Sequence, residues 1–195
     1  MFINWQHREL ILKIVYYGPA LSGKTTNLQQ IHARADPRRR GELVALKLHE
    51  DRTLYFDFLQ LELGKISGLS PKIHLYSVPG QNHFEASRKL VVRGADGIVF
   101  VADSAACRTN ANIEAWESMQ AQLQALNLPA NPIPVVIQLN KRDVPNAMPV
   151  PLLKSIFKVS HQATFESVAT TGQGVFDTLK AIINSVVTQV QQEVA

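Results

Sequence analysis

One stretch near the start of the chain limits the possible folds more than any other. Residues 18–25 read Gly-Pro-Ala-Leu-Ser-Gly-Lys-Thr, which fits the pattern G-x-x-x-x-G-K-T. A mostly apolar run of strand length (10–17) precedes it, and residues 26–31 have the apolar spacing of a helix. A strand, a tight loop and a helix start form the context of a phosphate-binding loop. The sequence therefore predicts a nucleotide site here.

Each residue type in this loop suits phosphate chemistry. Gly18 and Gly23 allow the backbone to curl so that successive N–H groups point at an anion, and the helix N-terminus adds its positive dipole end. Lys24 would reach the β- and γ-phosphates, and the Thr25 hydroxyl would ligate Mg²⁺. The expected nucleotide contacts are Gly18, Ala20, Leu21, Ser22, Gly23, Lys24, Thr25 and Thr26.

Composition favours one domain over residues 1–195. The net charge of +4 is modest, and the one dense cluster of basic residues is Arg38–Arg40. Because no aromatic residues are interleaved with this cluster, we expect no nucleic-acid partner. That triplet fits a solvated loop, or a contact with an acidic partner or membrane surface. The single cysteine, Cys107, suits a reducing cytoplasm. We expect neither an integral membrane segment nor a lipid anchor.

Strand-like and helix-like segments alternate after the loop, which predicts an α/β fold. Two alternating strands (59–63 and 72–78) should pair as an antiparallel hairpin, and Asp51–Thr53 should lie in a loop. The expected fold is that of a P-loop NTPase, three α/β/α layers around a mostly parallel sheet. Other expected strands are 10–17, 42–48, 97–102, 134–139 and 165–168; expected helices are a first one ending near Ala35, then 84–93, 113–126, 150–157 and a C-terminal one from Phe176.

Residues 140–143, Asn-Lys-Arg-Asp, follow the buried strand 134–139 and indicate which base is bound. The Asp143 carboxylate can accept two parallel bonds from the ring N–H and exocyclic amine of guanine, and adenine offers no such pair of donors. The Asn140 amide can bridge the base and the phosphate loop, while the Lys141 stem can lie along the ring. These residues predict that the bound base is guanine.

Together the two motifs resemble those of small Ras-like GTPases, and the resemblance implies further roles. Residues 79–81, Pro-Gly-Gln, stand where the family has its second switch. Gly80 would then donate its N–H to the γ-phosphate, and Gln81 would orient the attacking water. Thr53 would ligate Mg²⁺ only in the triphosphate state. Ala169, beside Val168, would meet the guanine oxygen with its N–H.

The chain departs from the Ras-like pattern at two positions. The acidic residue usually found three positions before Gly80 is Ser77, so an indirect Mg²⁺ ligand is missing, and Asp51 or Asp57 could substitute for it. The third residue of the phosphate loop is Ala20 rather than glycine, and its methyl group could crowd Gln81 during hydrolysis.

Residues 15–19, 23–28, 51–54, 56–58, 78–81, 140–143 and 174–180 carry a closer resemblance, which covers nearly the whole chain. They resemble the bacterial MglA family of gliding-motility and cell-polarity GTPases. The resemblance implies a switch between GDP and GTP with Mg²⁺, and a homodimeric roadblock (LC7-type, MglB-like) partner that stimulates hydrolysis. It also implies that Arg52 acts in cis as an arginine finger, with Gln81 and Lys24 as the other catalytic residues.

Three functions remain open at this point. The first is a GTPase switch that is slow without its partner. The second is a GTP-binding scaffold that barely hydrolyses, which Ala20 and Ser77 favour. The third is a small-molecule kinase of the P-loop class, which the residues 140–143 disfavour.

Overall fold

The fold is built on a central, mostly parallel sheet with a hydrophobic core on each face. A computed structural model describes the chain except residues 1, 5, 7, 50–51, 65–68, 81–84, 127–132, 160–161 and 195, and it leaves undescribed the side chains of 3–4, 46–49, 52–55, 85–87 and 193–194. The described strands form one sheet in the order β3-β4-β5-β2-β6-β7-β8, with β1 paired to β2. They are β1 Phe2–Asn4, β2 Glu9–Tyr17, β3 Val44–His49, β4 Arg52–Glu62, β5 Ser70–Ser77, β6 Gly97–Asp103, β7 Val135–Asn140 and β8 Thr164–Glu166.

The β2, β5, β6, β7 and β8 strands run parallel, whereas β3, β4 and β5 are joined by antiparallel pairing, and β1 is antiparallel to β2. The predicted α/β fold with an antiparallel hairpin is therefore confirmed. The helices are α1 Lys24–Arg34, α2 Glu85–Val92, α3 Thr109–Ala125, α4 Val150–Ile156 and α5 Val175–Val194, with short 3-10 turns η1 Pro37–Arg39 and η3 Ala106–Arg108.

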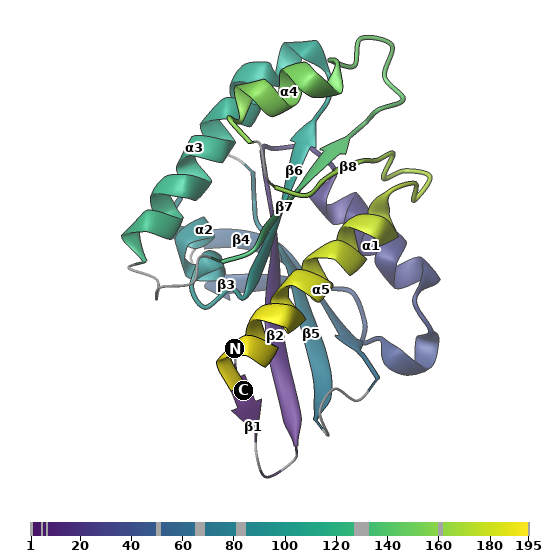
Figure 1. Cartoon of the computed structure of the whole chain (residues 1–195), viewed down its shortest axis with the longest axis vertical. Coiled ribbons are helices and arrows are strands. Elements are labelled where there is room, and N and C mark those ends of the chain that lie inside the picture. The colour runs from purple at the N-terminus through teal and green to yellow at the C-terminus, as the bar shows by residue number, and fades with distance from the viewer. Residues whose placement is uncertain are drawn as a thin grey trace.

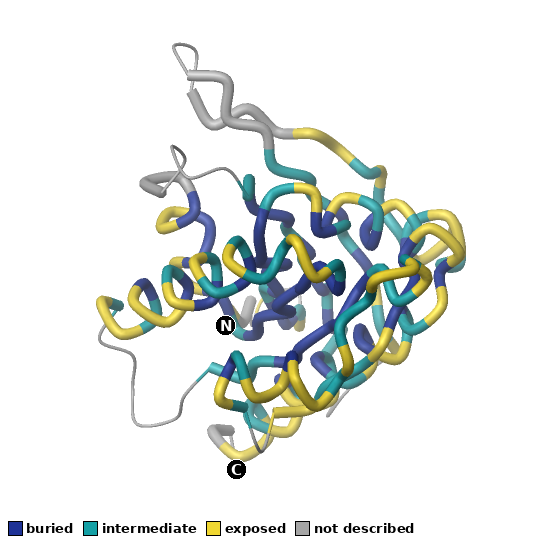
Figure 2. The backbone as a smooth tube through the Cα atoms, turned by 90° about the horizontal axis from the view of Figure 1, so that it is seen from above, coloured by how far each residue is buried: buried dark blue, intermediate teal, exposed yellow. Residues whose placement is uncertain are grey.

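Helices cover both faces of the sheet (Figure 1). On one face, Leu28 of α1 and Ile182 of α5 pack in a cluster with Ile14 of β2. On the other face, Trp116 of α3 and Leu153 of α4 pack in a second cluster. Buried residues run through the middle of the molecule, and exposed residues lie on the outer helix surfaces (Figure 2). Since both faces of β6 and β7 are covered, these two parallel strands are mostly apolar runs in the sequence.

One prediction about this sheet is wrong. Arg52 and Thr53 do not lie in a loop, because β4 begins at Arg52, and His49 and Arg52 are cross-strand neighbours of β3 and β4. Residues 52–59, Arg-Thr-Leu-Tyr-Phe-Asp-Phe-Leu, are rich in aromatic and β-branched types that favour strands. Pairing with β3 extends this strand back to Arg52, well beyond the alternating segment 59–63, whereas β5 pairs with residues 58–62.

Candidate nucleotide site

The glycine-rich loop lies between β2 and α1, at the carboxyl edge of the parallel strands. Gly18 and Gly23 have φ values of 140° and 100°, which side-chain-bearing residues rarely adopt. A β-carbon at Gly18 would lie 2.2 Å from the Val101 carbonyl oxygen, and one at Gly23 would lie 2.2 Å from the Asn140 amide nitrogen. Both glycines are therefore required by backbone conformation and by close packing.

The first turn of α1 leaves its N–H groups available to a ligand. Among the described residues no side chain caps this helix at Gly23, and its first turn carries no acidic residue. Uncapped N–H groups and the positive end of the helix dipole together favour an anion at this position.

Lys24 is held inside the loop. Its ammonium donates to the Gly18 carbonyl at 2.9 Å and to the Pro19 carbonyl at 2.6 Å, and only 7% of the residue is exposed. Burial, together with the positive charges of Arg88 and Arg108, lowers the pKa of Lys24 to about 7, while Asp57 opposes them. A buried cation beside two other cations is stabilised by a bound anion. The charges of the loop thus fit a polyphosphate.

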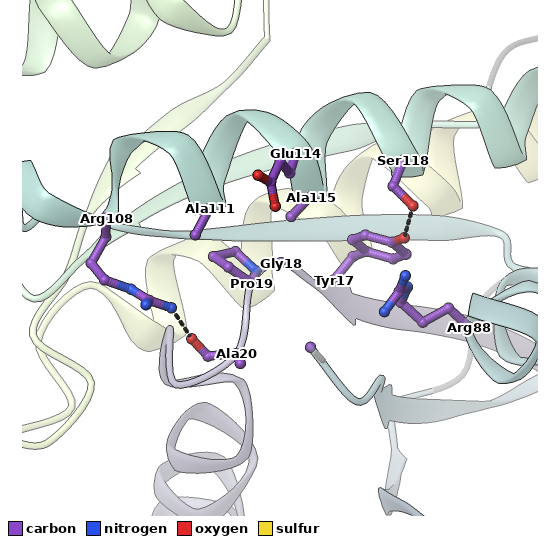
Figure 3. A pocket seen from close by; sticks show the side chains of 11 residues that line it. Tyr17, Gly18, Pro19, Ala20, Arg88, Arg108, Ala111, Glu114, Ala115 and Ser118 are labelled. Carbon is purple, nitrogen blue, oxygen red and sulfur yellow. Dashed lines mark hydrogen bonds between the residues drawn. The ribbon is translucent and has the colours of Figure 1, made fainter. Parts of the chain in front are cut away.

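Figure 3 shows the cavity beside this loop, into which Arg88 and Arg108 point. It has a volume of about 400 Å³ and is lined by the loop, Gly80, and residues of α2 and α3. Gly80 lies against the loop so closely that a β-carbon there would lie 2.3 Å from the Ala20 amide nitrogen. The structure thus places Gly80 beside the phosphate loop, where its predicted γ-phosphate contact requires it.

The predicted base-recognition residues come together on the other side of the loop. A smaller pocket of about 180 Å³ is lined by Leu21, Gly23, Thr26, Asn140, Lys141, Asp143, Val144, Ala169 and Thr170. Asn140 ties this pocket together, since its amide nitrogen donates to the Ser22 carbonyl at 2.7 Å and its amide oxygen accepts the Ala169 N–H at 2.9 Å. Buried Val168 lies at the start of the same loop, and its carbonyl accepts the N–H groups of Thr171 and Gly172.

Asp57 reaches the magnesium position proposed from the sequence. Thr25 donates its hydroxyl to the Asp57 carboxylate at 2.6 Å, and Ser77 donates to the same carboxylate oxygen. The pairing of Phe58 with Tyr76 brings Asp57 beside Ser77, at the loop end of β5. Mg²⁺ prefers hard oxygen ligands, needs few from the protein and completes its shell with phosphates and water. The described residues hold no cluster of three or more His, Cys, Asp or Glu for a dedicated metal cage. Thr25 and Asp57 fit a phosphate-bound Mg²⁺.

Two expected catalytic residues, Gln81 and Arg52, and the expected Mg²⁺ ligand Thr53 are less well defined. Gln81 lies outside the described residues, and the side chains of Arg52 and Thr53 are not described. Thr53 precedes Asp57 by four positions in an extended strand, which separates their backbones by roughly 13 Å. Asp57 rather than Thr53 therefore stands at Thr25 in this structure, and the roles of Arg52, Thr53 and Gln81 stay predictions.

Sequence reasoning missed three charged groups around the loop. They are Arg88 of α2, Asp103 of β6 and Arg108 of η3. The two arginines place positive charge near Lys24 and help to lower its pKa. Asp103 could have been found, because it ends a buried parallel strand at the same sheet edge as Asn140. No sequence pattern singles out the two arginines.

Known proteins resemble this chain over nearly its full length. The model of the ADP-ribosylation factor (Arf) family matches residues 2–186. The mutual gliding-motility protein MglA of Myxococcus xanthus (strain DK1622) is 48% identical over 191 residues, which cover 98% of each chain. The Ras-related protein Rab-5B of Plasmodium falciparum (isolate 3D7) is 25% identical over 167 residues, covering 84% of this chain and 72% of the relative. None of the described helices is both long and apolar enough to cross a membrane.

Proposed function

The chain belongs to the small Ras-like GTPases of the MglA family, and we propose that it is a Mg²⁺-dependent cytoplasmic switch of cell polarity or motility. Members of this class bind GTP or GDP and hydrolyse GTP, which sets the chain apart from small-molecule kinases. The proposed process follows the relative MglA, which is a gliding-motility protein. We treat residues 1–195 as one GTPase domain.

One observation carries the proposal. Asn140 bonds both to Ser22 of the phosphate loop and to the N–H of Ala169, so the guanine pocket and the phosphate cradle form one continuous site. Asp143 lines that pocket as the acceptor for the two guanine donors. The site thus suits a guanine nucleotide with its phosphates on Lys24.

Magnesium would be held by residues of this chain that already lie together. Thr25 would bind the ion directly, and Asp57, bonded to Thr25 and Ser77, would hold a metal-bound water in place of the missing acidic residue. Bound Mg²⁺ neutralises charge on the phosphates during transfer. Thr53 would join Thr25 only in the triphosphate state, which requires β4 to move relative to the loop.

We further propose that a roadblock-type homodimer stimulates hydrolysis by supporting the switch segments, and that the arginine comes from this chain. An arginine at the transition state is worth about 10³–10⁵ in rate. Arg52 begins β4, five residues before Asp57, so it too must move to reach the phosphates. A partner that holds β4 in the moved position would supply that change.

The test is GTP turnover by purified protein, alone and with the roadblock-type proteins of its own organism. We expect slow turnover alone and strong stimulation by one of them. Arg52→Ala should keep GDP affinity and partner binding but lose at least about 10² of the stimulated rate. The matched control is Arg39→Ala, an exposed arginine on η1, which should keep full stimulation. Stimulated turnover that survives Arg52→Ala would place the arginine elsewhere, and no turnover under any condition would favour the scaffold.

A further inference from the structure

The phosphate loop contains a turn that its own sequence disfavours. The Ser22 N–H donates to the Pro19 carbonyl at 3.4 Å, which closes a four-residue turn. Leu21, the third residue of this turn, has a φ of 64°, whereas Ala20 in the second position has no positive φ. That combination defines a type II turn, whose third position normally holds glycine or asparagine because side chains crowd the backbone there. Something outside the turn must therefore stabilise it.

The orientation of the central peptide is what distinguishes this turn from the common type I. That peptide joins the Ala20 carbonyl to the Leu21 N–H, and the two turn types differ by a flip of this unit. In a trans peptide the carbonyl and the N–H point in opposite directions. The side on which the Ala20 carbonyl lies thus decides which way the Leu21 N–H faces.

Arg108 holds the Ala20 carbonyl from outside the loop. Its Nη2 donates to that oxygen at 2.6 Å, and Figure 3 shows the guanidinium reaching from the start of α3 to the loop. A bond from a charged donor is about twice as strong as one between neutral groups. The Leu21 N–H is consequently turned away from Arg108.

Arg108 is itself held by a buried carboxylate. Its Nε lies 3.7 Å from Oδ2 of Asp103, which is 1% exposed. The same oxygen accepts a bond from the Lys141 ammonium at 2.7 Å. Asn112 fixes Asp103 in turn, accepting its backbone N–H at 3.0 Å and donating to its carbonyl at 2.8 Å. One fixed carboxylate thus anchors both a lysine of the base pocket and the arginine on the phosphate loop.

We propose that Arg108 is a positioning residue that keeps the Leu21 N–H facing the nucleotide phosphates. The inference rests on the proposed nucleotide site and adds a group outside the known motifs to it. Arg108 imposes the peptide orientation that a glycine would adopt without help. Because Arg108 and Lys141 both contact Asp103, this one carboxylate connects the phosphate loop to the base pocket.

A double-mutant cycle tests this, with GDP affinity as the readout. Arg108→Ala should weaken GDP binding about tenfold, the order expected for losing one bond from a charged donor. In a Leu21→Gly background the same change should cost less than about threefold, because glycine adopts positive φ without crowding. Arg108→Lys should keep part of the affinity. Lys13→Ala is the matched control, since it removes a cation that donates to the Arg93 carbonyl on a remote part of the sheet, and it should bind GDP like wild type.

A second readout follows the amide directly. In wild type, GDP should shift the NMR signal of the Leu21 amide strongly, and Arg108→Ala should reduce that shift. If Arg108→Ala lowers GDP affinity equally in the wild-type and Leu21→Gly backgrounds, or does not lower it at all, the inference is overturned while the nucleotide site stays intact. Failure of the wild-type protein to bind GDP would overturn the proposed function first and this inference with it.

Discussion

The two sides of the nucleotide site differ in how far they are assembled. On the base side, Asn140, Lys141 and the 168–173 loop are held by direct bonds to the phosphate loop and to buried groups. On the γ-phosphate side, Asp57 stands at Thr25, while Thr53 and Arg52 begin the same strand farther away. Under the proposed roles, the pocket that recognises the base is already assembled in the fold, whereas Arg52 and Thr53 would have to move to act in hydrolysis.

The largest effect should come from the base side. Asp143→Asn replaces an acceptor of two bonds with an amide that faces one guanine donor with its own N–H. Two bonds of about 1.5–3 kcal/mol each are at stake, so affinity for GDP and GTP should fall together by about 10²–10⁴. Relative affinity for xanthosine nucleotides, which carry an extra oxygen, should rise. Titrations with both nucleotide families measure this, and unchanged GDP binding would refute the guanine assignment.

On the γ-phosphate side, Asp57→Asn should affect the Mg²⁺ dependence of nucleotide binding and leave recognition of the base intact. It keeps the size of the side chain but removes the charge facing Thr25, so the Mg²⁺ requirement for tight binding should rise by about 10–100-fold, as for other groups that act through a metal-bound water. Affinity measured without Mg²⁺ should change little. Binding at graded Mg²⁺ concentrations gives the result; equal loss with and without the ion would remove Asp57 from the metal site.

The pH dependence of binding reports on Lys24, which lies between the two sides. Its pKa is about 7 without ligand, and bound phosphates raise that pKa, so binding takes up a proton above pH 7. Affinity for GDP should be level just below pH 7 and fall by up to about tenfold per unit above it. Lys24→Arg, which stays charged, is the comparison and should show no such fall up to roughly pH 8.5. Identical profiles for the two proteins would contradict the assignment.

The smallest effect is expected at Ala20. If its methyl group crowds Gln81, Ala20→Gly should raise intrinsic hydrolysis a few-fold, within roughly 1 kcal/mol of the barrier, without tightening GTP binding. Single-turnover hydrolysis measures this. An unchanged rate would remove the crowding argument.

Much of the fold and of the nucleotide site could be predicted from the sequence because local patterns determine them. The loop 18–25, the buried strands and residues 140–143 each carry their own signal, and the parallel sheet brings them to one edge. The start of β4 was mispredicted because pairing with β3, beyond the alternating segment 59–63, extends the strand to Arg52. Arg88 and Arg108 went unnoticed because only the tertiary packing of α2 and η3 brings them to the loop.

Hydrogen exchange compared between the GDP-bound protein and the protein bound to a non-hydrolysable GTP analogue tests the central claim most directly. Residues 140–143 and 168–173 should show the same protection in both states, because the base side is already assembled. Protection should change along β3, β4 and around Gly80, where the triphosphate must reorganise the site. Equal protection of β4 in both states, or a change centred on residues 140–143, would contradict the account.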